Sequence, residues 1–378
     1  MAQVLGNENS PKSWMRDSNG NAVGESGSDL ESRVVGDFKE LIVIGGSAGA
    51  IELLPNLLRG LREKTDAPIF VVIHVSPASD GKWIRAMSRQ TGLPMRPAEA
   101  DRPIRRGEIV FAKGDYHLVV HSQKSTFVHG PFENKFRPSI DVLFRSAAVK
   151  HGPRVFGILL SGLLDDGCAG GLAIESCGGV CLVQDPEDAL FGDLPANARD
   201  ILTKPVVAKA SDLPEAFEQV LKRMEPAKEI TPPINLVREV AMGTDACSHV
   251  EDLNQIGKPS PFGCPECGGP MWKLDAGPMD RFRCHIGHSH TSRSLLEAKD
   301  EQVNQALWVA LRALEERVRI LEKLDRKRGG SFGQYDSMAK RLSETRRHAD
   351  VLRRLILDPP EEQLANAPVA EPLQESRA

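Results

Sequence analysis

The sequence predicts an α/β fold: a doubly wound, mainly parallel sheet with a small antiparallel patch, followed by a small cysteine- and histidine-rich module and a helical hairpin. Three observations predict the sheet. Short apolar runs recur between Phe38 and Leu221. Three of them, IVI from Ile42, FVVI from Phe70 and FGILL from Phe156, are apolar at every position, which is typical of strands buried on both faces of a parallel sheet. The segments between the runs suit the crossover helices that such a sheet needs.

The composition is that of a globular protein without an overall charge bias. The chain has 378 residues, more than a usual single domain, and 40% of them are hydrophobic, enough for a sizeable core. The formal net charge of -4 favours neither nucleic acid nor an anionic membrane surface as a partner. No apolar run approaches the roughly 18 residues of a membrane span, and the N-terminus lacks the apolar core of a signal peptide. We therefore expect a cytoplasmic protein with no nucleic-acid partner and no direct membrane insertion.

The first part of the chain divides into three segments. Residues 1–37 are rich in Gly, Ser, Asn, Asp and Glu and are expected to form a disordered leader. Residues 38–224 carry the apolar runs and are expected to form the sheet domain. Within this domain, residues 107–130 suggest two or three shorter strands joined by turns, which predicts the antiparallel patch. Residues 225–262 contain many prolines and polar residues and are predicted to be a linker.

The second part of the chain also divides into three segments. Residues 263–292 hold the cysteine- and histidine-rich module. In residues 293–358, apolar side chains recur at steps of three and four over two stretches separated by KRGGSFGQYD. This periodicity predicts an antiparallel helical hairpin or a coiled-coil arm. Residues 359–378 are expected to be a disordered tail.

A glycine-rich turn, GGSAG from Gly45 to Gly49, follows the first predicted strand. It fits G-x-S-x-G, the pattern that places a serine at a tight strand-to-helix turn with its hydroxyl exposed at the carboxyl edge of the sheet. It lacks the Lys-[ST] pair of a phosphate-binding P-loop. From the turn alone, three interpretations remain open. Ser47 is a nucleophile, the turn cradles a phosphate or nucleotide, or the glycines have a purely structural role.

A serine nucleophile needs a base and a group that orients the base. His74 ends the second predicted strand, and Asp165 and Asp166 follow the run FGILL, so an open parallel sheet brings them to the edge where Ser47 lies. Backbone N–H groups of residues 161–164 could serve as oxyanion donors. Structural roles also remain open, namely a partly buried histidine and aspartates that cap the next helix. The order Ser, His, Asp differs from that of the α/β-hydrolases.

Several segments of this domain resemble the catalytic domain of chemotaxis protein-glutamate methylesterases, the CheB family. The resemblance spans about residues 39–222. It rests on the segments GGSAGA, VVIHVSP, GEIVFAKGDYHLVV, RPSIDVLFRSAA, ILLSGLLDDGCAGG and LVQDPEDALFGDLP. It implies that Ser47 attacks the γ-glutamyl methyl ester of a receptor, that His74 is the general base and that Asp166 orients this base. Asp165 falls on a variable position of the family pattern.

The resemblance also implies a function. The chain would demethylate the cytoplasmic helices of methylated chemoreceptors in chemotaxis signalling, with deamidation of receptor glutamines as a second activity. Catalysis would need no cofactor, and other proteins of the chemotaxis array would be further partners. Family members usually carry an N-terminal receiver domain, for which the forty or so residues before the first strand leave no room, so control by a receiver in cis is not expected. Residues 137–141, RPSID, are expected to contact the substrate.

One departure from the family pattern concerns the turn that precedes Asp166. The chain reads SGLLDDG, with Leu163 and Leu164 where the family commonly has Met and Gly. If the backbone conformation of that glycine is needed, Leu164 would strain the turn or reshape the oxyanion site.

The cysteine- and histidine-rich module contains the motifs CPECGG and RFRCHIGHSH. A CxxC pair turns both thiolates toward one point, and a further cysteine with a nearby histidine completes a tetrahedral zinc site. Cys264, Cys267 and Cys284 are the expected cysteine ligands. His288 is favoured over His285 as the fourth ligand, because three intervening residues leave more freedom to close the site. A structural zinc is therefore expected, and the alternative is a metal-free loop with unpaired thiols.

Two other functions remain open from the sequence. The chain could be a non-catalytic scaffold of a signalling complex that uses the module and the helical arm, or an esterase that acts on another acyl substrate. The retained Ser47, His74 and Asp166 favour an enzyme over a scaffold.

Overall fold

The computed structural model describes residues 38–76, 81–224, 230–244, 250–275, 277–327 and 335–357. The predicted leader, residues 1–37, and the predicted tail, residues 359–378, lie outside the described residues. The chain divides into two compact units, the first ending at Leu295 and the second beginning at Leu296. Each unit is described by itself.

The centre of the first unit is a seven-stranded sheet in which every pair of neighbouring strands is parallel. Its strands, in spatial order, are β10 (Val206–Ala208), β9 (Val180–Gln184), β8 (Val155–Leu159), β1 (Leu41–Gly46), β2 (Ile69–Ile73), β5 (Ile109–Phe111) and β3 (Met95–Pro97). From β1 in the middle of the sheet, the chain builds outward first on one side and then on the other, which is the doubly wound arrangement. The predicted fold class is confirmed.

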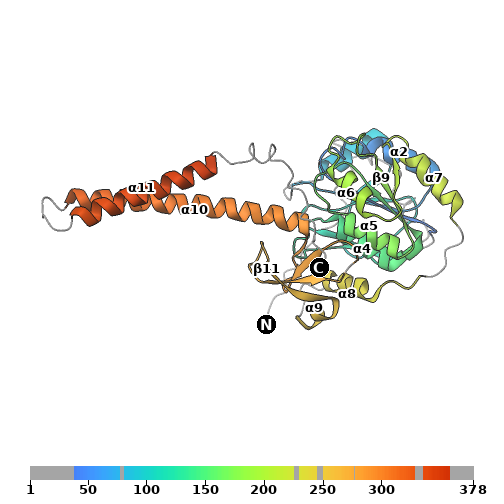
Figure 1. Ribbon diagram of the computed structural model, residues 1–378. Coiled ribbons are helices and arrows are strands. Elements are labelled where there is room, and N and C mark those ends of the chain that lie inside the picture. The colour runs from blue at the N-terminus through green and yellow to red at the C-terminus, as the bar shows by residue number, and fades with distance from the viewer. Residues whose placement is uncertain are drawn as a thin grey trace, which may run out of the picture. The chain divides into compact units, whose positions relative to one another are not determined.

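Helices cover both faces of this sheet (Figure 1). One face carries α2 (Leu54–Lys64), α3 (Lys82–Thr91) and α7 (Leu213–Arg223), and the other carries α4 (Ile140–His151), α5 (Cys168–Ser176) and α6 (Asp193–Ile201). The alternation along β1 explains the two layers, because Ile42 and Ile44 pack into the first core and Leu41 and Val43 into the second. Strand β1 is therefore buried on both faces, as its uninterrupted apolar sequence predicts.

A small antiparallel sheet lies within the same unit, as predicted. Its strands, in spatial order, are β4 (Arg102–Pro103), β7 (Lys124–Val128) and β6 (His117–Val120). The predicted patch at residues 107–130 needs one correction, because β5 pairs with β2 and β3 in the parallel sheet instead. The three residues of β5 are fully buried, which suits a position between two parallel neighbours.

The segment predicted to be a linker, residues 225–262, differs from that expectation over residues 234–244 and 250–262. It forms α8 (Ile234–Thr244), α9 (Val250–Ile256) and the strand β11 (Gly257–Gly263). Apolar side chains on both helices join Trp272 and Leu274 in a small core, and Glu239 of α8 is buried in an ion pair with Arg281. These partners lie up to 42 residues away along the chain, so the local composition gives no sign of them.

An antiparallel sheet follows, built from β11, β12 (Pro270–Leu274), β13 (Arg281–Cys284) and β14 (Ser289–Thr291). We call residues 257–291, which contain these four strands, the Cys–His module. It begins six residues before the predicted boundary at 263, because β11 pairs with β12 from Gly257 onward.

The second unit contains two long helices. Helix α10 (Ser292–Lys327) starts in the first unit and continues into the second, and α11 (Tyr335–Leu357) lies beside it (Figure 1). Ion pairs join Glu322 to Arg346 at 2.6 Å and Glu315 to Arg353 at 2.8 Å, so the two helices run antiparallel. Within the described ranges, no helix combines the length and the apolar character needed to cross a bilayer.

Candidate functional site

Ser47 and His74 follow neighbouring strands at the same edge of the parallel sheet. Gly46, the last residue of β1, is paired with Ile73, the last residue of β2. The backbone N–H of His74 donates to the carbonyl of Gly46 at 3.2 Å, and the N–H of Ser47 donates to the carbonyl of Ser161, after β8, at 2.9 Å. The ends of three adjacent strands are thus joined around Ser47.

Two glycines allow the backbone to approach Ser47 closely. Gly49 has a φ of +77°, a conformation that disfavours any side chain. A Cβ on Gly162 would lie 2.9 Å from the Cβ of Ser47. The glycine-rich turn therefore has a structural role, and that role leaves the half-buried Ser47 at the carboxyl edge of the sheet.

His74 and Asp166 form a buried pair. The Nε2 atom of His74 lies 2.8 Å from Oδ2 of Asp166, and the side chains are 6% and 1% exposed. The imidazole ring stacks on Phe136 with ring centroids 3.6 Å apart and an angle of 8° between the planes. Its Nδ1 atom is buried and has no hydrogen-bond partner among the residues that the structure describes. Nδ1 is therefore the nitrogen that can accept a proton from a neighbouring hydroxyl.

Hydrogen-bond donors surround the carboxylate of Asp166. Besides His74, they are Ile140 N at 2.7 Å, Ser139 Oγ at 2.8 Å, Asn134 Nδ2 at 3.0 Å and Asp141 N at 3.4 Å. Burial alone would raise the pKa of Asp166, but the hydrogen bonds from His74 and Asn134 outweigh it and hold the pKa below its usual range. An ionised Asp166 accepts from His74, so in a neutral imidazole the proton lies on Nε2 and Nδ1 is the acceptor.

The two neighbouring carboxyls of the site differ from Asp166. Oδ1 of Asp165 accepts from Thr291 Oγ1 at 2.9 Å, and burial raises the pKa of Asp165 to about 6. Burial and the charge of Asp166 raise the pKa of Asp141 to about 7. The strand pattern alone left open which of the two adjacent aspartates faces the histidine, and the family resemblance implied Asp166. The structure pairs His74 with Asp166.

The turn after β8 contains a leucine with a positive φ. Leu164 has a φ of +60°, in the left-handed region that glycine prefers. Its carbonyl accepts from Asn197 Nδ2 at 2.7 Å. The N–H groups of Ser161 and Gly162 donate to Gln184 Oε1 and to the Phe191 carbonyl, so both are already used. Of the four N–H groups predicted to be oxyanion donors, those of Leu163 and Leu164 therefore remain as candidates.

Sequence reasoning missed several residues that contact His74 or Asp166. These are Asn134, Phe136, Ser139 and Ile140. The sequence predicted substrate contacts for residues 137–141, whereas Ser139 and Ile140 bind Asp166, and Arg137 is paired with Asp115. A signal was present for Ser139, since a serine before a helix usually caps it. Here the hydroxyl makes no cap and donates to Asp166 instead.

Four side chains of the Cys–His module could hold a metal ion. The ligand atoms of Cys264, Cys267, Cys284 and His288 all lie within 4.8 Å of one another. His288 Nδ1 is 3.7 Å from Cys264 Sγ and 3.5 Å from Cys284 Sγ, and the Cys267 and Cys284 sulfurs are 3.7 Å apart. A zinc tetrahedron with Zn–S bonds of about 2.3 Å has edges of about 3.8 Å, so these spacings fit zinc.

Two short turns bring these ligands together. The N–H of Gly268 donates to the carbonyl of Cys264, the N–H of Gly287 donates to the carbonyl of Cys284, and both glycines have positive φ. The group contains His288, the histidine that the sequence favoured. His285 is outside this group, and its ring lies over Gly269, where an added Cβ would be 2.3 Å from the ring.

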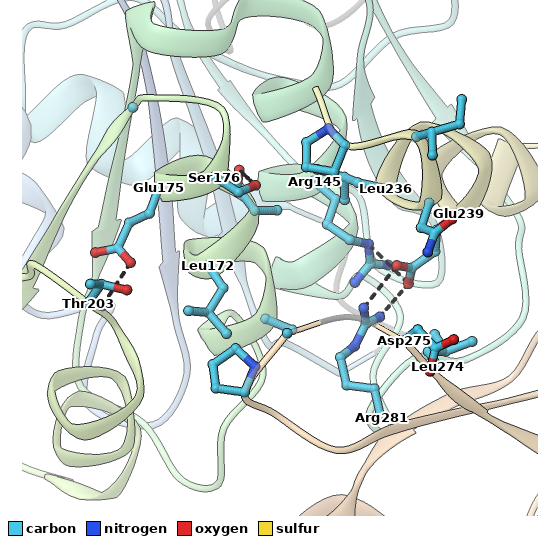
Figure 2. A pocket seen from close by; sticks show the side chains of 18 of the residues that line it. Arg145, Leu172, Glu175, Ser176, Thr203, Leu236, Glu239, Leu274, Asp275 and Arg281 are labelled. Carbon is cyan, nitrogen blue, oxygen red and sulfur yellow. Dashed lines mark hydrogen bonds and ion pairs between the residues drawn. The ribbon is translucent and has the colours of Figure 1, made fainter. Parts of the chain in front are cut away.

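A cavity of about 770 Å³ lies away from Ser47, His74 and Asp166. Its walls come from α5, α8 and the Cys–His module. Arg145, Glu239 and Arg281 meet on one wall, as Figure 2 shows. The predicted catalytic residues are outside its lining, so this cavity is separate from the candidate active site.

The part of the chain that holds the candidate site matches a known protein family. Residues 42–217 match the CheB methylesterase family. A putative protein-glutamate methylesterase/protein-glutamine glutaminase of Leptospira interrogans is 34% identical over 179 residues, which are 47% of this chain and 93% of that protein. Enzymes named protein-glutamate methylesterase/protein-glutamine glutaminase from a Nocardioides species and from Borreliella burgdorferi are 34% and 32% identical over 188 residues. The match covers 50% and 48% of the lengths of these two proteins.

The catalytic domain of the CheB methylesterase of Thermotoga maritima is a solved structure that also resembles the chain. The sequences are 24% identical, the TM-score is 0.45, and the match covers 48% of this chain and 99% of that one. The family assignment does not depend on this likeness.

Proposed function

The chain belongs to the CheB methylesterase family, and from that premise we propose that it hydrolyses γ-glutamyl methyl esters on chemoreceptors, with Ser47 as the nucleophile. The single observation that carries this proposal is the buried pair of His74 and Asp166, which lies at the edge of the sheet where Ser47 also lies. With Nε2 bound to Asp166, Nδ1 is the ring nitrogen left to act as the base.

The proposed reaction has two steps. Ser47 Oγ attacks the ester carbonyl while Nδ1 of His74 takes the hydroxyl proton. The tetrahedral intermediate then expels methoxide, which leaves as methanol with the proton from Nδ1. In the second step water attacks the acyl-enzyme, His74 again takes and returns one proton, and a glutamate carboxylate is released with Ser47 regenerated. The same sequence with ammonia as the leaving group would deamidate a glutamine.

Asp166 has a positioning and electrostatic role in this scheme. Its negative charge stabilises the imidazolium that forms when His74 takes the proton. Its Oδ2 atom keeps the remaining His74 proton on Nε2, and Phe136 holds the plane of the ring. Asp166 does not need to accept a proton itself, which agrees with its lowered pKa.

An apolar rim beside Ser47 supports a protein substrate over a small ester. Leu163, Leu190 and Phe191 are 47%, 75% and 39% exposed. A Cβ on Gly49 would be 3.0 Å from the Cβ of Leu190, so this leucine borders the serine turn. Exposed apolar side chains that gather beside a catalytic group are suited to bind an apolar surface of a partner. The proposed partners are the cytoplasmic helices of methylated chemoreceptors, and the proposed place of action is the cytoplasm.

We further propose that Cys264, Cys267, Cys284 and His288 hold a structural zinc ion. Four protein ligands fill a tetrahedral site and leave no position for water or substrate, so the metal would stabilise the fold and take no part in the reaction. Metal analysis of the purified protein should find about one zinc per chain. The Cys264→Ser and Cys284→Ser proteins should lose it, and unchanged zinc in both would refute the assignment.

Labelling with a fluorophosphonate probe tests the proposed nucleophile. The probe should modify the wild-type chain at Ser47, identified by mass spectrometry of the labelled peptide. Labelling should disappear in Ser47→Ala and fall steeply in His74→Ala. The matched control is Ser211→Ala, which removes an exposed hydroxyl that bonds only Asp212 among the described residues and should label like the wild type. A folded wild-type protein that the probe does not label would contradict the proposal.

A further inference from the structure

We propose that the Cys–His module completes the catalytic site, because it holds Asn134 and Phe136 in the positions from which they orient Asp166 and His74. This inference rests on the proposed function of Ser47, His74 and Asp166. It concerns positioning residues, since neither Asn134 nor the module contacts the reacting atoms.

The module is joined to the catalytic domain by backbone hydrogen bonds. The N–H of Asn134 donates to the carbonyl of Ser289 at 2.8 Å, and the N–H of Ser289 donates to the carbonyl of Phe132 at 3.2 Å. Glu133 and Ser289 form a parallel β-bridge. Residues 132–134 are thus paired with Ser289 of β14 in the module.

The side chain of Asn134 links the end of the module to the carboxylate of Asp166. Its Oδ1 atom accepts from Thr291 N at 3.0 Å and from Ser294 Oγ at 3.1 Å. Its Nδ2 atom donates to Asp166 Oδ1 at 3.0 Å and to Asp141 Oδ2 at 2.9 Å. Donors on one side and carboxylates on the other fix which way the buried amide points. Thr291 at the end of the module and Ser294 in the first turn of α10 therefore determine the orientation of the amide that binds Asp166.

The backbone between Asn134 and Phe136 adopts a conformation that needs such support. Asn134 and Lys135 have φ values of +51° and +72°. Left-handed backbone is unfavourable for residues other than glycine and persists where surrounding contacts fix it. The next residue, Phe136, stacks on His74. Releasing Asn134 from the module would therefore disturb the contacts of both His74 and Asp166.

Buried ion pairs also hold the Cys–His module against the catalytic domain. Glu133 is paired with Arg145 of α4 and, at 3.1 Å, with Arg283 of β13. Glu239 of α8 is paired with Arg281 of β13 and, at 3.5 Å, with Arg145 (Figure 2). All five side chains are at most 4% exposed. Separating them would leave unpaired charges in the interior, so the module is a fixed part of the catalytic unit.

A double-mutant cycle on the full chain tests the route through Asn134. Asn134→Gly removes the amide and tolerates the positive φ, and it should slow fluorophosphonate labelling of Ser47 about 10- to 100-fold. Ser294→Ala removes one donor to the amide and should slow labelling about 3- to 10-fold. In the double variant the second change should add nothing, because Ser294 acts through Asn134. Additive effects, or wild-type rates in both single variants, would overturn the proposal.

Two further measurements separate positioning from loss of folded protein. A positioning role slows the labelling rate while the final stoichiometry stays at one label per chain, whereas partial unfolding lowers the stoichiometry. With an ester substrate, kcat should fall while KM is unchanged. The matched control is Ser260→Ala, a serine of the same module whose hydroxyl bonds the Met271 carbonyl at 2.9 Å, and its labelling rate should equal that of the wild type. A wild-type chain that is not labelled would refute the proposed function itself, whereas a labelled wild type with unaffected variants would refute only the role of the module.

Discussion

The replacement Asp166→Asn exchanges one carboxylate oxygen of the proposed triad for an NH2 group. The hydrogen bonds around Asp166 determine where that NH2 group lies. The new amide can lie in two orientations. With its NH2 at the Oδ1 position, it faces Asn134 Nδ2 and Asp141 N, and two buried donors lose their acceptor. With its NH2 at the Oδ2 position, Ile140 N alone is left without an acceptor, because His74 Nε2 can accept in its other tautomer. The second orientation costs less and should predominate.

That orientation places the His74 proton on the wrong nitrogen. When Nε2 accepts from the new amide, Nδ1 carries the proton and can no longer take one from Ser47. We therefore expect about a 10⁴-fold loss in the rate of labelling and of ester hydrolysis, as when a triad carboxylate becomes an amide without a change in geometry. The free energy of unfolding should fall by about 1–3 kcal/mol, the cost of one buried donor without a partner.

The adjacent aspartate offers a matched control. Asp165→Asn makes the same chemical change one residue earlier, where the carboxylate accepts from Thr291. Its labelling rate should stay within about tenfold of the wild type, since the oxygen of the new amide can still accept from Thr291 and no bond to His74 is involved. The assay is the rate of fluorophosphonate labelling alongside denaturant unfolding. Wild-type labelling of Asp166→Asn, or a larger loss in Asp165→Asn, would refute the reasoning.

Three other predictions follow from the same structure. Leu164→Gly should be more stable than Leu163→Gly by about 1–2 kcal/mol in denaturant unfolding, because only Leu164 has positive φ, and equal stabilities would contradict the strain. Burial raises the pKa of Asp165 from 3.8 to about 6, so the folded chain keeps a proton that the unfolded chain loses. The unfolding free energy should therefore fall by about 2 kcal/mol from pH 4 to pH 6 through this group. Asp165→Asn should remove this part of the pH dependence of the unfolding free energy, measured by thermal melts at several pH values. An unchanged pH dependence would contradict the role of Asp165. Removal of the proposed zinc by a chelator should lower the melting temperature and slow labelling of Ser47. An unchanged labelling rate in a metal-free chain whose Cys–His module has unfolded would show that the module does not support the catalytic site.

Much of the fold could be predicted from short-range patterns. Strands β1, β2 and β8 are apolar at every position, so their burial and parallel pairing followed from the sequence. Ser47 and His74 could be found for the same reason, because each follows the end of such a strand. The four grouped Cys and His side chains could be found because their spacing is local.

The parts that the sequence did not predict depend on partners far along the chain. Residues 225–262 contain many prolines, yet Glu239 is fixed there by Arg145 and Arg281. The choice between Asp165 and Asp166 depends on which one faces β2, and spacing alone could not decide it. Asn134 had no visible motif, since its four hydrogen-bond partners come from three separate regions of the chain. Buried polar networks of this kind are determined by tertiary structure and leave little trace in a single sequence.

The most direct test of the central claim is the release of methanol from receptor that carries radiolabelled methyl esters. The purified chain should release labelled methanol, Ser47→Ala should release none, and Ser211→Ala should match the wild type. Release that persists in Ser47→Ala, or no release from a folded wild-type chain that the fluorophosphonate probe does label, would contradict the account of this protein as a methylesterase that acts through Ser47.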